Sequence, residues 1–191
     1  HGLMRDFLVE HRAKTPLFTE LAQEFIRYLE HVRSPRKEDY PFMLELTHYE
    51  WAELALGISE VNINEAEIQH DEELLDGVPV LSPLAWLCSY HYPVHRIDPE
   101  FIPEAPGESL TWLLVYRDRN DRVGFMELNP VTAQLLQRLK ENRHKSGKRL
   151  LEEIASALQH PNSKTVIRGG AEILHDLQAR DIILGSRIAR G

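Results

Sequence analysis

The sequence has a single cysteine and no long apolar run. Cys88 alone cannot form a disulfide within one chain or supply a cysteine cluster for zinc or an iron–sulfur centre, and scarce cysteine is typical of a reducing cytosol. No stretch approaches the roughly 18–20 apolar residues of a membrane-spanning helix. The first residues also lack the charged-then-apolar pattern of a signal peptide. We therefore predict a cytoplasmic protein.

Common catalytic and nucleotide-binding motifs are absent as well. The chain contains no Gly-x-Ser-x-Gly elbow, phosphate-binding loop, dinucleotide fingerprint or His-Glu-x-x-His helix. Cys88 has no neighbouring base and lies between apolar residues, which favours a buried, inert thiol over a nucleophile. The sequence therefore predicts a protein that is not an enzyme, with no catalytic residues and no cofactor.

Glutamate and histidine three residues apart form the main metal-related pattern. On a helix such a pair shares one face, as in di-iron carboxylate bundles, but ten histidines and many glutamates produce chance matches. His91 and His95 lie in a segment predicted to be extended, which places them about 13 Å apart. The pairs are Glu45/His48, Glu67/His70, Glu141/His144 and Glu172/His175. We predict no metal site, and Glu45/His48 is the strongest candidate among them.

Charge is distributed unevenly along the 191 residues. Residues 1–110 hold 8 Lys and Arg against 21 Asp and Glu, a net charge of −13, and residues 111–191 hold 14 against 9, a net charge of +5; the whole chain carries −8. Such asymmetry indicates different partners for the two halves, or one half docking against the other. It is equally compatible with two solvated surfaces.

The first sixty residues are expected to be helical. Thr15–Pro16 is typical of a helix start, and apolar residues recur at helical spacing over residues 17–32 until Ser34–Pro35 ends the pattern. A second helix is predicted from Tyr40–Pro41 to Ile58. Because an apolar helical face already begins at Leu3, we expect the first helix to start upstream of the first residue.

Residues 60–80 form an acidic connector that ends in the turn Gly77-Val78-Pro79. We place a domain boundary here, between a helical domain of residues 1–76 and an α/β domain of residues 77–191. Residues 84–94 are rich in aromatic and branched side chains, which favours a strand interrupted at Pro93. Alternating residues 110–117, a polar turn and Val123–Leu128 then predict a β-hairpin.

Three helices and a closing strand are predicted after the hairpin. Asn129–Pro130 starts the first helix, breaks occur near Ser146–Gly147 and Pro161, and residues 182–184 form the strand. Gly169–Gly170 inside the third helix indicates close packing or close approach of a partner. The predicted fold class is α+β, with an N-terminal helical bundle domain followed by a small α/β domain that contains the hairpin and a winged-helix-like three-helix unit.

A basic cluster surrounds the loop between the first two of these helices and reappears at the start of the third. Such cations suit contact with DNA phosphates or attraction of an acidic peptide, and a solvated surface is the purely structural alternative. The cluster comprises Arg138, Lys140, Arg143, His144, Lys145, Lys148, Arg149, Lys164, Thr165 and Arg168. The candidate DNA-binding residues among them are Lys145, Lys148, Arg149, Lys164, Thr165 and Arg168.

Several unusual strings, in this order, resemble one known family over nearly the whole chain. The family is that of the HvfC-type partner proteins, related to the methanobactin-biosynthesis partner subunit and earlier labelled DNA-binding. The strings are Met4-Arg5-Asp6-Phe7 with His11-Arg12 and Thr15-Pro16, then residues 46–56, Tyr92-Pro93-Val94-His95-Arg96-Ile97, residues 113–119 and Glu127-Leu128-Asn129-Pro130-Val131-Thr132-Ala133.

The resemblance implies a helical N-terminal domain joined to a smaller α/β domain. It also implies partnership with a multinuclear iron oxidase that modifies cysteines in a ribosomally made precursor peptide. The partner protein would hold and present the leader peptide, and the iron would belong to the oxidase. Members of the family carry further N-terminal helices, which agrees with an upstream start.

A free hairpin edge can accept an extended peptide as an additional strand. We predict a peptide groove between the second hairpin strand and the start of the third helix, with candidate residues Val123, Phe125, Glu127, Lys164 and Arg168. Which hairpin strand is the edge does not follow from the sequence. The acidic helical half would face the oxidase, with Tyr49 and Trp51 as anchors or as core residues. The alternative function is a DNA-binding transcriptional regulator, which the acidity of the first half disfavours.

Overall fold

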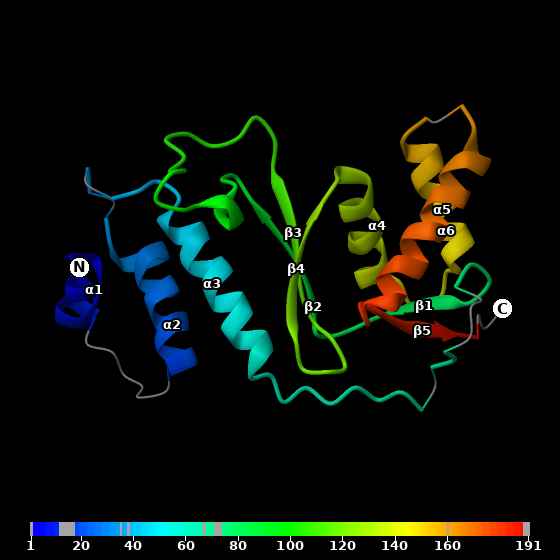
Figure 1. Ribbon diagram of the computed structural model, residues 1–191, viewed down its shortest axis with the longest axis horizontal. Helices are drawn as coiled ribbons and strands as arrows, with labels where there is room; N and C mark the ends of the chain where they lie inside the picture. Colours follow the sequence, from blue (N-terminus) through cyan, green and yellow to red (C-terminus); the bar gives the residue numbers. More distant parts are fainter. Residues whose placement is uncertain are drawn as a thin grey trace. The chain divides into compact units, whose positions relative to one another are not determined.

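The computed structural model describes residues 2–11, 18–34, 36–37, 39–66, 68–70, 74–159 and 161–188. The protein is α+β, as predicted, and combines helices with antiparallel strands (Figure 1). It forms two compact units, each built from two stretches of chain: residues 1–58 with 89–111, and residues 59–88 with 112–191. The single boundary expected between residues 76 and 77 stays a prediction.

The first unit is mainly helical. Its elements are α1 (Gly2–Asp6) with the π-helical turn η1 (Phe7–His11), α2 (Phe18–Arg27) with a second such turn η2 (Tyr28–Val32), and α3 (Met43–Gly57). The Phe7 ring lies 5.1 Å from the ring of Phe25 and 5.5 Å from that of Tyr28, which forms an aromatic core. η2 ends before Ser34, where the sequence predicted a stop. The expected helix start at Thr15–Pro16 lies outside the described residues.

Residues 89–111 contribute an irregular segment to the first unit. The Glu45 carboxylate on α3 accepts hydrogen bonds from the backbone N–H groups of His91 (3.0 Å) and Tyr92 (2.9 Å). The strand expected over residues 84–94 is therefore shorter than predicted: β2 (Ala85–Tyr90) ends at this point, and η3 (Val94–Arg96) is a 3₁₀ turn. Pro93 and the hydrogen bonds to Glu45 divert the chain, so the extended spacing assumed for His91 and His95 was wrong.

The strands form two small sheets. β2, β3 (Thr111–Arg117) and β4 (Val123–Leu128) make a three-stranded sheet in the order β2-β3-β4. β3 and β4 are the predicted hairpin, with Trp112 opposite Leu128 and Arg117 opposite Val123. The side chain of Asp118 fixes its turn by accepting hydrogen bonds from the backbone N–H groups of Asn120 and Arg122. The second sheet pairs β1 (Val78–Leu81) with β5 (Ile183–Arg187) antiparallel.

Three capped helices complete the second unit. They are α4 (Pro130–Glu141), α5 (Gly147–Ala157) and α6 (Ser163–Ala179). The side chains of Asn129, Ser146 and Asn162 each accept a hydrogen bond from a backbone N–H in the first turn of the helix that follows. The hairpin, three helices and closing strand thus occur in the predicted order. Their apolar faces share one core with β3 and β5, which includes Leu114, Leu136, Leu151, Leu174 and Ile183.

Two glycines mark places where backbone segments meet closely. A Cβ on Gly147 would lie 2.2 Å from the carbonyl oxygen of Leu74, so the start of α5 sits directly against the 74–77 turn. Gly185 has a φ of +145°, and a Cβ there would lie 2.2 Å from the carbonyl oxygen of Gln69. The backbones of Gln69 and Ser186 exchange two hydrogen bonds of 2.8 and 2.9 Å. Residues 68–70 and 74–77 are thereby built into the second unit.

Candidate functional site

The candidate peptide-binding strand β4 lies at the edge of its sheet. β4 pairs with β3, and the sheet order leaves its other side without a strand among the described residues. Val123, Phe125 and Glu127 share one face of the strand because they alternate along it. Phe125 and Glu127 are exposed and Val123 is half-buried. The structure thus answers which hairpin strand is the edge, and the three candidate residues lie together on it.

The start of α6 lies away from β4. Lys164, Thr165 and Arg168 are all exposed on the first turns of α6. β4 packs against β3 and α4, and Figure 1 shows α4 between the hairpin and the α5–α6 pair. The two parts of the predicted groove are therefore not brought together. Lys164 and Arg168 make no ion pair with the residues that the structure describes.

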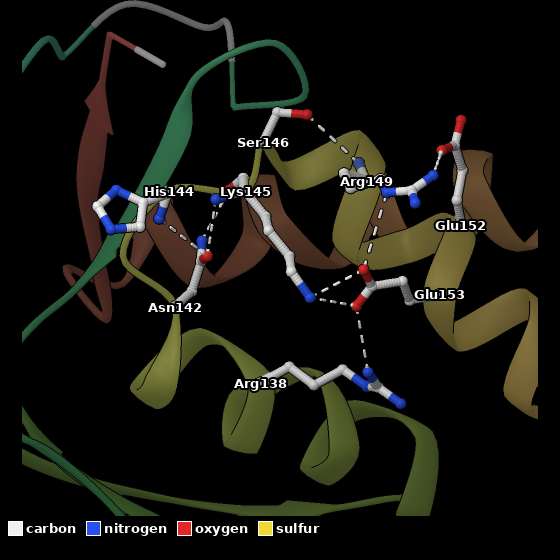
Figure 2. Close-up of polar contacts among 8 residues, drawn as sticks. All are labelled: Arg138, Asn142, His144, Lys145, Ser146, Arg149, Glu152 and Glu153. Carbon is white, nitrogen blue, oxygen red and sulfur yellow. Dashed lines mark hydrogen bonds and ion pairs between the residues drawn. The ribbon is translucent and has the colours of Figure 1, made fainter. Parts of the chain in front are cut away.

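Three members of the predicted basic cluster, Arg138, Lys145 and Arg149, are paired with neighbouring carboxylates. Figure 2 shows three cations converging on Glu153 from α4, the following loop and α5. Lys145 Nζ lies 2.9 Å from this carboxylate, Arg138 Nη1 3.4 Å and Arg149 Nε 3.8 Å. The hydrogen bond from Lys145 and the nearby positive charges hold the pKa of Glu153 below its ordinary value. Glu152 lies 3.5 Å from Arg149 Nη1.

The spacing of charges along α5 is a sequence signal for part of this network. Glu152 and Glu153 follow Arg149 by three and four residues, the spacing at which helical side chains meet. Two of the six candidate DNA-binding residues, Lys145 and Arg149, therefore have carboxylate partners. Ion pairs at such a surface are individually weak, but they lower the positive potential that a polyanion would encounter.

The loop between α4 and α5 is held by the side-chain amide of Asn142 and by backbone hydrogen bonds. The Asn142 side chain donates from Nδ2 to the Lys145 carbonyl (2.7 Å) and accepts at Oδ1 from the Lys145 backbone N–H (2.9 Å) (Figure 2). Backbone N–H groups of Gly147 and Lys148 donate to the carbonyls of Gly77 and Leu75. The backbone of this loop is thus fixed at both ends.

Glu45 and His48, the first of the glutamate–histidine pairs, each have a hydrogen-bond partner within the first unit. Glu45 holds the 91–92 backbone, and Nδ1 of His48 lies 2.9 Å from the Tyr90 hydroxyl. Burial lowers the pKa of His48. Cys88 is buried, with 9% of its surface exposed. No group of three or more His, Cys, Asp or Glu side chains suited to a metal ion occurs in the described ranges, and Glu67 lies outside them.

The fold and the site define a class of protein: an α+β chain whose C-terminal unit offers a strand edge and a partly neutralised basic surface. The chain belongs to the HvfC family, because the model of the HvfC C-terminal domain matches residues 82–178, about half of the chain. A search of curated proteins finds no match. At the family level, this membership points to a partner protein of an oxidase in the maturation of ribosomally made peptides. Across the parts that the structure describes, no helix has the length and apolarity needed to cross a membrane.

Proposed function

We propose that this protein is a non-catalytic cytoplasmic adaptor that binds the leader of a ribosomally made, cysteine-containing precursor peptide and presents it to an iron-dependent oxidase. The observation that carries the proposal is the exposed edge of β4 in a member of the HvfC family. An extended leader would pair with this edge through backbone hydrogen bonds, and its side chains would contact Val123, Phe125 and Glu127. Contacts at Lys164 and Arg168 would require a leader that continues around α4 to α6.

Strand addition makes a prediction that other binding modes do not share. The fluorescence anisotropy of the labelled cysteine-containing peptide encoded beside this protein should rise when the protein is added. Methylating the backbone nitrogens of every second leader residue removes a set of hydrogen bonds worth roughly 0.5–1.5 kcal/mol each. We expect binding to weaken by tenfold or more when the methylated set faces β4.

The control is the same peptide methylated at the other set of backbone nitrogens. These point away from β4, so its backbone hydrogen bonds to β4 are all kept. Phe125→Ala should also weaken binding, whereas Lys164→Glu with Arg168→Glu reports whether the leader reaches α6. Equal affinities for both methylated peptides would rule out strand addition at β4. Absence of any peptide binding would contradict the adaptor function itself.

A sequence-specific DNA-binding regulator is the competing function, and one experiment separates the two. Anisotropy with labelled duplex DNA at two salt concentrations would show steep salt dependence if phosphates were contacted. The ion pairs at Glu153 and the net charge of −8 oppose such binding. Sequence-dependent DNA binding without peptide binding would contradict the adaptor function and support a DNA-binding regulator.

A further inference from the structure

Two adjoining cavities open on the second unit beside the β1–β5 sheet. One, of about 470 Å³, lies between β1 and the C-terminal end of α4. The other, of about 640 Å³, lies over the 66–69 segment and the end of β5. Val78, Arg143 and Arg187 line both cavities, so the two adjoin, and we call them together the β1 groove.

Among the described residues, the β1 groove is lined by cations and by no carboxylate. Lys140 and Arg143 belong to the end of α4 and the loop after it, His144 follows them, and Arg187 is the last residue of β5. All four are exposed, and none forms an ion pair with an acidic residue in the described ranges. This contrasts with Arg138, Lys145 and Arg149, which surround Glu153 nearby (Figure 2). In a chain with an excess of acidic residues, such a lining is a complementary surface for an anion.

The groove is rigidly supported. Arg143 donates from Nη1 to the carbonyls of Lys140 and Asn142, both at 3.0 Å, which fixes its direction at the end of α4. Its remaining nitrogens make no hydrogen bond within the described part of the chain. Arg187 stands opposite Val78 in the β1–β5 ladder. Two guanidinium groups thus stand on separate fixed elements around one hollow, and each can bind a carboxylate in a bidentate manner.

The chemistry of β1 favours side-chain recognition over strand addition. Pro79 has no N–H, so the middle of β1 cannot offer the donor that a full additional strand needs. Duplex DNA is also a poor occupant. DNA-binding motifs commonly insert a protruding helix into the major groove, whereas this site is a hollow, and the chain is acidic overall. Carboxylates on a flexible segment can reach into the hollow without pairing to the backbone of β1.

We propose that the β1 groove binds an acidic stretch of the peptide partner through Arg143 and Arg187, with Lys140 and His144 adding positive charge. This rests on the proposed function and extends it, since it gives the chemistry of one part of the peptide: carboxylate side chains in a segment outside the strand that pairs with β4. The groove is thereby a second contact that is distinct from the β4 edge.

The test uses the full chain and two labelled model peptides. One alternates glutamate with serine, and the other has glutamine in place of glutamate. We expect the glutamate peptide to bind, its affinity to fall with added salt, and Arg143→Gln with Arg187→Gln to weaken it about tenfold. Arg122→Gln with Lys148→Gln is the matched control: it removes the same charge from exposed positions of the same unit that do not line the groove, and it should change the affinity by less than about twofold.

Because Arg143 also caps α4, Arg187→Gln alone serves as a second variant and should weaken binding about threefold with unchanged thermal unfolding. The proposal is overturned if the glutamate peptide does not bind, if the glutamine peptide binds equally well, or if the control variant loses as much affinity. It is also overturned if duplex DNA binds in its place with loss in the Arg143 and Arg187 variants. If the precursor peptide binds equally well to wild type and to the Arg143 and Arg187 variants, the groove is not a binding site for it, and the adaptor function is still supported. If the glutamate peptide binds but the precursor peptide does not, the groove is supported and the adaptor function is contradicted.

Discussion

At the scale of single residues, carboxylates decide which cations remain available to a partner. Glu153 forms ion pairs with three basic side chains (Figure 2). The nearby Arg143 side chain, by contrast, donates only to backbone carbonyls among the described residues. The sequence predicted one basic cluster because it shows positions of charge along the chain. It could not show that Arg138 and Lys145, 15 and 8 residues before Glu153, point towards the same carboxylate.

His48 gives the stability of the first unit a dependence on pH. Burial lowers the pKa of His48 in the folded state, so the unfolded chain takes up its proton more readily. The stabilisation is present above the unfolded pKa of about 6.5 and is lost as the pH falls through the lower folded value. In urea unfolding, wild type should therefore lose stability on acidification faster than His48→Gln, which keeps a polar group near the Tyr90 hydroxyl. Parallel curves for the two proteins would contradict this role.

At the scale of elements, local patterns were enough for some parts and not for others. Asn129–Pro130 and the alternation around Trp112 specify a helix start and a hairpin from neighbouring residues alone, and both are confirmed. The pairing of Val78 with Arg187 joins residues more than a hundred positions apart. Short strands of this kind have no periodicity long enough to predict a partner. The β1 groove depends on that pairing, which is why no part of the sequence indicated it.

The two adjacent glycines of α6 offer a matched test of helix packing. A Cβ on Gly170 would lie 2.2 Å from Cδ2 and 3.0 Å from Cγ of buried Leu151, whereas nothing lies within 4 Å of a Cβ on Gly169. Gly169→Ala should raise the free energy of unfolding by about 1 kcal/mol through helix propensity. Gly170→Ala should lower it by roughly 1–2 kcal/mol, because overpacking of α5 exceeds that gain. Chemical denaturation that gave both substitutions the same sign would refute the close contact.

At the scale of the whole molecule, residues 59–76 are expected to be part of the second unit. Leu74 and Ile68 are buried, with 1% and 8% of their surfaces exposed, and Gln69 pairs with Ser186. A fragment of residues 77–191 should therefore be several kcal/mol less stable than one of residues 59–191, since each buried apolar side chain contributes about 1.5–3 kcal/mol. Urea midpoints of the two fragments measure the difference. Equal midpoints would support the boundary predicted after residue 76.

A substitution in the full chain checks the same point without relying on fragments. Leu74→Ala should lower the free energy of unfolding by about 2–5 kcal/mol, because it leaves a cavity in the core of the second unit. Val61→Ala, at a position with 49% of its surface exposed, is the control and should change it by less than about 0.5 kcal/mol.

The chain passes between its two units at three peptide links, which join residues 58 to 59, 88 to 89 and 111 to 112. Hydrolysis of the middle link would yield two fragments, and each would carry one part of both units. The products would therefore behave as a split protein, held together by contacts within each of the two units. They would come apart only when these contacts were lost in both units, and we expect two separately produced halves to reassemble by complementation.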